Sequence, residues 1–124
     1  MTKQLEFEIA SFLIERNWHK PLPADVAKSI CIEAAELLEV FQWNAASIAK
    51  VKRDKKMLER IKQELADVFI YGLVMAVSLG LETTSMIQKK LAQVKKKYPA
   101  ELMRGSAPAS NNAYYRIKQG YRRK

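Results

Sequence analysis

Cysteine and histidine are nearly absent from this chain of 124 residues, which contains one of each. The lone Cys31 cannot form an internal disulfide, which is consistent with a reducing compartment. As a small residue in a helical pattern, Cys31 is expected in the core. Structural and catalytic zinc sites usually draw on His or Cys ligands, so the composition disfavours zinc.

Long apolar runs and targeting segments are also missing. The longest apolar stretch, residues 68–79, is far short of the roughly 18–20 residues needed to span a bilayer. The first residues lack the basic segment, apolar core and cleavage site of a secretion signal. We therefore expect a soluble cytoplasmic protein. A chain of this length supports one domain that buries about two thirds of the surface of its unfolded form.

The net charge of +9 is concentrated near the C-terminus. Residues 89–124 contain 11 basic residues and one acidic residue, a balance of +10, which leaves −1 for residues 1–88. The body of the protein is thus nearly neutral. A basic tail with interleaved tyrosines can bind nucleic acid, fold over an anionic ligand or remain solvated.

Helical periodicity dominates the sequence, and alternation typical of strands is almost absent. It predicts helices over about residues 3–17, 24–42, 55–79 and 82–97, with Thr2 capping the first and Gly80 ending the third. Residues 44–56 read as a basic connector with at most a short helical turn. Gly105, Pro108 and residues 110–112 mark a loose C-terminal segment. We predict an all-α, four-helix bundle-like domain over residues 1–105 and a basic tail over residues 106–124.

Two pairs of acids, Glu33 with Glu36 and Glu64 with Asp67, lie within the apolar stripes of the second and third predicted helices. At about 100° per residue, side chains seven and three residues before each leading acid, and four and seven after it, share its face. These positions hold Val26, Ile30, Leu37 and Val40 in one helix and Met57, Ile61, Val68 and Tyr71 in the other. One pair could be an accident of an exposed surface, but two pairs in the same apolar frame are hard to obtain by chance. Buried carboxylates are costly unless a cation compensates them.

A shared metal ion fits this pattern. Helices pack about 8–10 Å apart, so inward carboxylates from facing helices come within reach of one ion. Ligation by carboxylate oxygens favours Mg²⁺, with Mn²⁺ possible, whereas a di-iron bundle needs Glu-x-x-His elements that this chain lacks. Because Mg²⁺ often binds through carboxylates and substrate phosphates, the sequence predicts a nucleoside polyphosphate substrate and attack of water on phosphorus.

The segment from Ile32 to Trp43, IEAAELLEVFQW, and the segment from Glu64 to Tyr71, ELADVFIY, carry a family resemblance. They resemble the all-α nucleoside triphosphate pyrophosphohydrolase superfamily, most closely the MazG-like branch that contains dCTP pyrophosphatase. The similarity covers roughly residues 5–105. It implies a helical dimer or tetramer that hydrolyses a nucleoside triphosphate to the monophosphate and pyrophosphate, using Mg²⁺ held by Glu33, Glu36, Glu64 and Asp67.

The same resemblance implies a nucleotide site. Trp18, Trp43 and Tyr71 match aromatic positions around the base and sugar; the alternative is that they fill the interior of the bundle, most of all Tyr71, which lies in the apolar stripe. Lys90 and Lys97 match positions associated with phosphate, as does Arg104, which follows Tyr98-Pro99. We take Glu36 as the candidate that orients or deprotonates the attacking water.

Two single residues and one short segment depart from the family pattern. Val94 stands where an Asn is usual, and a Val side chain cannot form a hydrogen bond. Residues 19–23 lack the expected aromatic-His and Asn-Leu pattern, and Ile9 replaces a His of the dCTP branch. The metal site is therefore better supported than the base preference.

Two other interpretations remain open at this point. One is a non-catalytic helical module that binds nucleic acid or a protein through its basic C-terminal third. The other is an enzyme of the same superfamily with dUTP or a phosphoribosyl nucleotide as its substrate. We favour a Mg²⁺-dependent, homo-oligomeric enzyme that acts on a dCTP-like or non-canonical nucleotide, and we expect neither nucleic acid nor a membrane as its partner.

Overall fold

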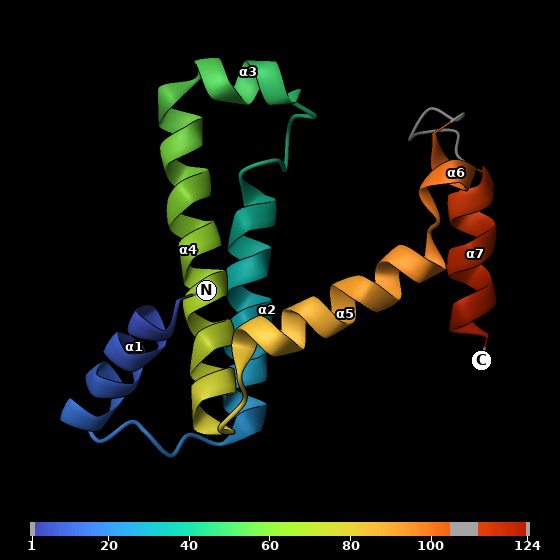
Figure 1. Ribbon diagram of the computed structural model, residues 1–124. Helices are drawn as coiled ribbons and strands as arrows, with labels where there is room; N and C mark the ends of the chain where they lie inside the picture. The colour runs from blue at the N-terminus through green and yellow to red at the C-terminus, as the bar shows by residue number, and fades with distance from the viewer. Residues whose placement is uncertain (1, 105–111, 124) are drawn as a thin grey trace. The chain divides into compact units, whose positions relative to one another are not determined.

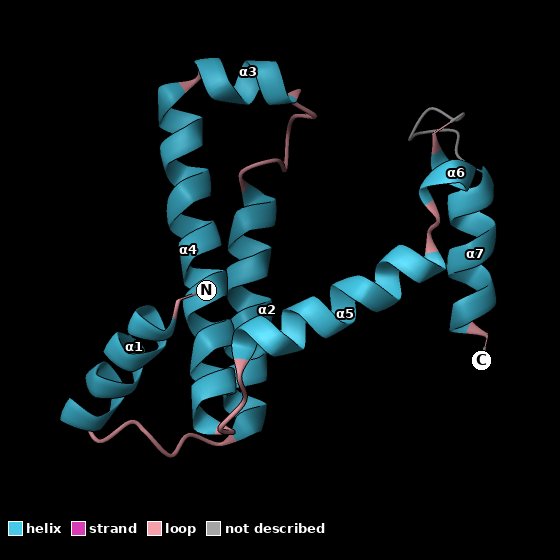
Figure 2. Cartoon of the chain, in the orientation of Figure 1, coloured by secondary structure: helices cyan, strands magenta, loops and turns pink. Residues whose placement is uncertain are grey.

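The computed structural model describes residues 2–104 and 112–123, and these ranges contain helices and no strands (Figure 1; Figure 2). The all-α class is confirmed. The chain divides into two compact units, Met1–Thr83 and Thr84–Lys124. The helices are α1 (Lys3–Glu15), α2 (Pro23–Glu39), α3 (Ile48–Arg53), α4 (Lys55–Ser78), α5 (Thr83–Lys97), α6 (Ala100–Met103) and α7 (Asn112–Arg122).

Short polar residues and left-handed residues set the limits of α1 and α4. Thr2 caps α1 by accepting a hydrogen bond from the backbone N–H of Leu5. After α1, Asn17 adopts a φ of 58°, and the N–H of Trp18 donates to the carbonyl of Leu13 at 2.8 Å. This arrangement is a Schellman motif. Gly80, with a φ of 66°, ends α4 in the same way, as the sequence predicts, and the N–H of Leu81 donates to the carbonyl of Ala76.

The first unit is built on α2 and α4, which lie side by side and run in opposite directions, with α1 packed against α4 (Figure 1). Its core joins Ile9 and Leu13 of α1, Val26 of α2, and Leu73 and Val74 of α4. All eight apolar residues that flank the acids in sequence register are buried or half-buried. The structure thus confirms the apolar frame around the two acid pairs.

The periodicity of residues 3–17 predicts Leu5 and Phe12 on the buried side of the first helix, but these two side chains and that of Cys31 are exposed. Leu5 and Phe12 lie at the border of the buried face of α1 and keep about two fifths of their surface exposed. Cys31 is exposed because it lies two residues before Glu33, on the opposite side of α2 from the packed face. A small apolar residue in a helix therefore does not report burial by itself.

The connector between α2 and α4 is more ordered than the sequence indicates. It contains α3, a helix of six residues whose first turn is capped by Ser47 through the N–H of Lys50. Asp54 ends α3 and caps α4 by accepting a hydrogen bond from the N–H of Met57 at 3.0 Å. A single aspartate thus joins the two helices in a sharp corner.

The second unit contains most of α5 together with α6 and α7. The rings of Tyr98 and Tyr114 stack with centroids 5.0 Å apart, which fixes the start of α7 next to the end of α5. Lys97 lies over Tyr98 and Tyr121, with its Nζ 5.2 Å and 4.5 Å from the two ring centroids. The loose segment predicted around Gly105 and Pro108 lies outside the described residues.

The prediction of a loose segment does not extend to residues 112–122, which form α7. The contacts of α7 come from residues at helical spacing. Ile117 and Lys118 are half-buried, Tyr114 stacks on Tyr98, and Tyr121 lies beneath the Nζ of Lys97.

Within the described residues, no single helix is long and apolar enough to cross a membrane. α4 and α5 meet that test of length and composition only when taken together as a bent pair.

Candidate metal centre and nucleotide pocket

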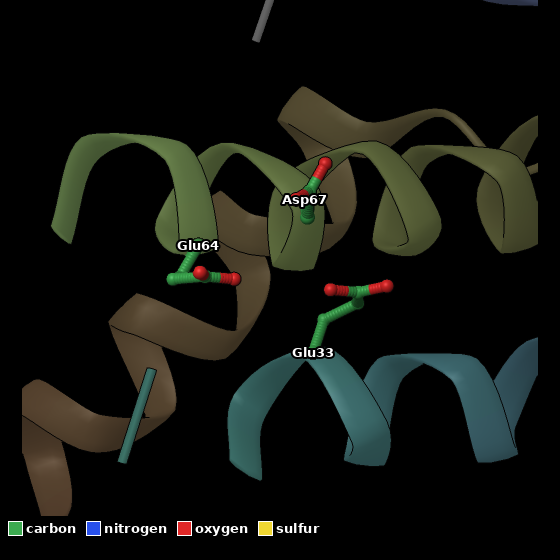
Figure 3. A group of neighbouring side chains, drawn as sticks. All are labelled: Glu33, Glu64 and Asp67. Atoms are coloured by element: carbon green, nitrogen blue, oxygen red, sulfur yellow. The ribbon is translucent and has the colours of Figure 1, made fainter. Parts of the chain in front are cut away.

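Three of the four predicted acids meet between α2 and α4. Glu33 extends from α2, and Glu64 and Asp67 extend from successive turns of α4 (Figure 3). Each offers one carboxylate oxygen, and these oxygens lie within 4.8 Å of one another. All three side chains are half-buried, because the apolar residues that pack the two helices surround them on the same face.

The carboxylates of the acid cluster repel one another electrostatically. Partial burial raises the pKa of Glu33 above its ordinary value, and the neighbouring carboxyl of Glu36 adds to the increase, followed by Asp67 and Glu64. Burial likewise raises the pKa of Glu64, with Glu36 as the next cause, while Arg60 acts in the opposite direction. A cation placed among the acids would relieve this repulsion.

The donor set fits a hard divalent cation. Opposite ligands of octahedral Mg²⁺ lie about 4.2 Å apart, twice the usual Mg–O distance of about 2.1 Å. Adjacent ligands lie about 3.0 Å apart in the same geometry, so the oxygens of Glu33, Glu64 and Asp67, which lie within 4.8 Å of one another, would draw closer together on binding a common ion. Oxygen ligands from Glu and Asp suit Mg²⁺ or Mn²⁺ and leave coordination positions for water or phosphate.

Glu36 borders this cluster without joining the closest group of oxygens. Its side chain is exposed, and its carboxyl is near enough to Glu33 and Glu64 to raise the pKa of both. The structure thus brings three of the predicted ligands together and leaves the fourth at their edge. Its part in metal binding stays a prediction.

Two of the predicted aromatic residues, Trp18 and Tyr71, line a pocket of about 360 Å³. Phe12 is a third aromatic residue of the lining, and its ring meets that of Trp18 edge to face at 6.0 Å. The remaining lining is mostly apolar. Asp67 belongs both to this lining and to the acid cluster, so the pocket opens directly beside the candidate metal centre.

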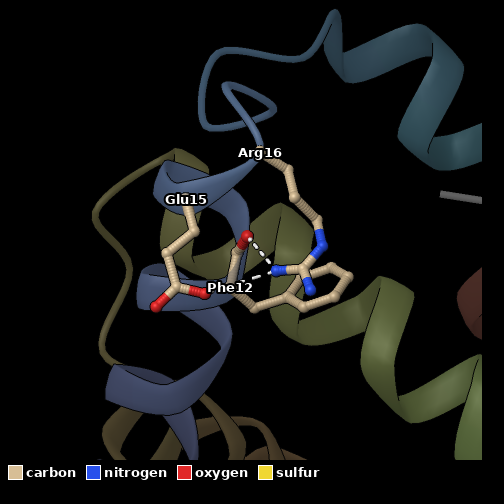
Figure 4. Close-up of polar contacts among 3 residues, drawn as sticks. All are labelled: Phe12, Glu15 and Arg16. Atoms are coloured by element: carbon tan, nitrogen blue, oxygen red, sulfur yellow. Dashed lines mark hydrogen bonds and ion pairs between the residues drawn. The ribbon is translucent and has the colours of Figure 1, made fainter.

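Arg16 contacts Phe12, one of the three aromatic residues of the pocket lining (Figure 4). Its guanidinium lies 4.0 Å from the centroid of the Phe12 ring, and its Nη1 donates to the carbonyl oxygen of Phe12 at 3.1 Å. The same nitrogen lies 3.4 Å from the carboxylate of Glu15. These contacts position one aromatic side of the pocket before any ligand binds.

The structure does not gather the other predicted nucleotide residues into this pocket. Trp43 follows α2 with 89% of its surface exposed and is absent from the lining. Lys90, Lys97 and Arg104 belong to the second unit; Lys90 and Arg104 are exposed, and Lys97 is half-buried against tyrosine rings. Their roles in phosphate binding stay predictions.

Sequence reasoning missed two polar residues of the pocket, Asp25 and Ser29. Their signal was available, because Asp25, Ser29 and Glu33 follow one another at intervals of four residues and so share one face of α2. Arg60 stands in the same relation to Glu64 on α4 and was also missed. Both helices thus extend the acid face with further polar groups.

Comparison with known proteins gives a consistent family. The MazG-like family model matches residues 28–109. The chain is 30% identical over 100 residues to dCTP pyrophosphatase 1 of Rattus norvegicus and 29% identical over 100 residues to that of Mus musculus. Each alignment covers 79% of this chain and 59% of the relative, so the chain spans somewhat over half the length of these proteins.

A solved structure is similar over most of both chains. The crystal structure of a pyrophosphatase from Archaeoglobus fulgidus shares 32% sequence identity with this protein and superposes with a TM-score of 0.66. The superposition covers 78% of this chain and 91% of the archaeal one. With a family model that spans about two thirds of the sequence and includes all four candidate acids, the chain belongs to the MazG-like family.

Proposed function

We propose that this protein is a Mg²⁺-dependent pyrophosphohydrolase that converts a nucleoside triphosphate, dCTP-like or non-canonical, into the monophosphate and pyrophosphate. The observation that carries the proposal is that the acid cluster and the aromatic pocket share Asp67. The cluster suits a metal bound to phosphate, and the pocket suits a flat base. Such an activity would remove unwanted nucleotides from the cellular pool.

Glu33, Glu64 and Asp67 would hold the metal, with Glu36 beside them. Bound Mg²⁺ would neutralise charge on the phosphate oxygens and make the attacking water more acidic. The carboxylates of α2 and α4 would thereby place the reacting phosphate between the two helices. The similar proteins are named as pyrophosphatases, which supports pyrophosphate release as the reaction.

We propose that Glu36, the most exposed member of the acid group, activates the attacking water. Its carboxylate would accept a proton while the water oxygen forms a bond to the α-phosphorus. The bond from that phosphorus to its bridging oxygen breaks at the same stage, and pyrophosphate leaves with the electron pair. The products are then a nucleoside monophosphate and pyrophosphate.

The aromatic pocket would hold the base next to the phosphate site. Stacking on rings such as those of Trp18 and Tyr71 is worth about 1–3 kcal/mol per base in single-strand binding proteins. Trp43 would cover the base or sugar, while Lys90 and Lys97 and also Arg104 would contact phosphate oxygens, in line with the resemblance to the family.

An assay of purified protein with a nucleotide panel and Mg²⁺ tests this function. We expect pyrophosphate release from at least one deoxynucleoside triphosphate, with dCTP, dUTP and phosphoribosyl nucleotides included to separate the members of the superfamily. The double substitution Glu64→Gln with Asp67→Asn should lower kcat/KM by more than about 100-fold, since loss of even an indirect metal partner costs 10–100-fold. Glu8→Gln, an exposed change on α1, is the matched control.

Thermal melting distinguishes an enzyme from a helical scaffold. Mg²⁺ should raise the melting temperature of the parent and leave that of the double variant unchanged, because only the parent binds the ion in its folded state. In the absence of metal, the double variant should melt higher than the parent, since it lacks the repelling charges. A failure of every nucleotide to react, together with identical Mg²⁺ responses, would leave only the scaffold interpretation.

A further inference from the structure

The pocket contains two polar side chains that the proposed chemistry does not use. Asp25 and Ser29 line it together with aromatic and apolar residues, and both lie on α2. Apart from Asp67, which belongs to the acid cluster, Asp25 is the only residue with a carboxylate among the described residues of the lining. The Asp25 side chain is 65% exposed, so its carboxylate lies where this mostly apolar pocket meets solvent and gives the pocket a side on which a ligand can form hydrogen bonds.

The helical register places these residues on the base side of the pocket. Asp25, Ser29 and Glu33 follow at intervals of four, so they share one face of α2. At 1.5 Å per residue, Ser29 and Asp25 lie about 6 Å and about 12 Å along the helix axis from Glu33. A nucleotide whose phosphates meet Glu33 would therefore extend its sugar and base toward Asp25.

Both polar groups present hydrogen-bond acceptors. The hydroxyl of Ser29 donates its hydrogen to the backbone carbonyl of Asp25 at 3.0 Å, so its oxygen has only lone pairs to offer a ligand. The ionised carboxylate of Asp25 also accepts and does not donate. This end of the pocket thus matches a ligand with donor hydrogens and repels one with carbonyl oxygens.

We propose that Asp25 is the base-discriminating residue of this protein, selecting the 4-amino group of a cytosine-type base or the equivalent 6-amino group of adenine. Uracil and thymine carry a carbonyl oxygen at the corresponding position, which would face the acceptors of Asp25 and Ser29. The inference rests on the proposed function, because it requires a nucleotide in this pocket. It adds to that function the residue that sets the base preference.

Asp25 also has contacts that any helix-terminal acid forms. It lies in the first turn of α2, and Lys28 Nζ is 3.9 Å from its carboxylate. A purely structural role would affect all substrates equally through the stability of α2. The informative measurement is therefore the ratio of kcat/KM between two nucleotides that differ in the amino or carbonyl group and in the proton on the adjacent ring nitrogen.

The experiment compares dCTP with dUTP, and dATP with dITP, on the parent and on Asp25→Asn. Because a hydrogen bond to a charged group discriminates by roughly tenfold or more, the amino nucleotide of each hydrolysed pair should be preferred by at least about tenfold. The amide of Asp25→Asn offers N–H hydrogens to a carbonyl, so the ratio should fall toward one. Glu8→Gln, the same type of change at an exposed position outside the pocket, should leave the ratio unaltered.

Asp25→Ser, which keeps a residue favoured near helix starts, provides a second variant and should also reduce the ratio. Equal hydrolysis of the two members of each pair by the parent would overturn the inference while the proposed function stands. A uniform loss of activity on all substrates in both Asp25 variants, with an unchanged ratio, would overturn it as well. If the parent hydrolyses no nucleotide, the proposed function itself fails, and that outcome is recognisable because no ratio can be measured.

Discussion

Asn17 shows how the backbone conformation of one residue positions the next, Trp18, which lines the pocket. Its φ of 58° lets the N–H of Trp18 reach the carbonyl of Leu13, which fixes the chain just before the pocket residue Trp18. A left-handed backbone costs most residues about 1–2 kcal/mol, while Asn tolerates it and Gly adopts it freely. Asn17→Ala should therefore lower the free energy of unfolding by about 1 kcal/mol, as measured by urea denaturation.

Asn17→Gly is the matched variant, since it removes the same side chain and keeps the left-handed conformation accessible. Its free energy of unfolding should equal that of the parent to within a few tenths of a kcal/mol. An equal loss in both variants would instead assign the effect to contacts of the Asn side chain.

For single residues, the sequence predicts which acids form the metal cluster more reliably than it predicts which residues line the pocket beside them. The acids Glu33, Glu64 and Asp67 could be identified because burial and charge conflict at their positions, and the structure brings them together. Asp25 could not be recognised in the same way. It lies at the start of a helix, where an acid is favourable for its own sake, so no conflict marks it as a functional residue.

The pairing of α2 with α4 brings like charges from two helices together, and this has a consequence for pH dependence. The pKa values of Glu33 and Glu64 are raised in the folded protein by burial and by neighbouring carboxyls. The folded state therefore binds more protons than the unfolded state above the ordinary pKa of 4.5. Without metal, the stability from these groups is present below that pH and is lost as the pH rises through the raised values.

Melting temperatures measured in a chelator from about pH 4 to pH 8 test this consequence. Relative to Glu64→Gln, the metal-free parent should lose stability as the pH rises, and added Mg²⁺ at neutral pH should reverse the loss. Subtracting the variant removes the titration of the groups that do not interact with Glu64. Parallel curves for the two proteins would show that the acids do not repel one another.

Helix positions were predictable where caps and periodicity agree. Thr2 and Gly80 lie at the expected ends of α1 and α4, since local hydrogen bonds decide such ends. α7 was missed because its helical spacing follows a segment rich in Gly, Pro, Ser and Asn, whose composition indicated a loop. Its contacts with Tyr98 join residues that are distant in sequence, and no local pattern reports them.

For the whole molecule, charge and apolar surface are distributed unevenly. Residues 84–124 contain 11 basic residues and one acid, whereas residues 1–83 carry a net charge of −1. The first unit exposes large apolar side chains on the helices that bear the acids, including Ile32 and Leu38 on α2 and Phe69 on α4. We interpret these exposed apolar side chains as part of a surface that contacts another chain.

We therefore predict that the protein is a homodimer or homotetramer in solution. Phe69 is 49% exposed on α4 and lies outside both the acid cluster and the pocket lining, so its substitution tests assembly without altering the site directly. A charge at a buried aromatic contact commonly costs at least about 2 kcal/mol, equivalent to about a 30-fold weaker association. Sedimentation velocity over a range of concentrations should show an oligomer for the parent and a shift toward monomer for Phe69→Glu. Gln4→Glu adds the same charge at an exposed polar position of α1 and should assemble like the parent. A monomeric parent, or a Phe69→Glu variant that assembles as well as the parent, would contradict this prediction.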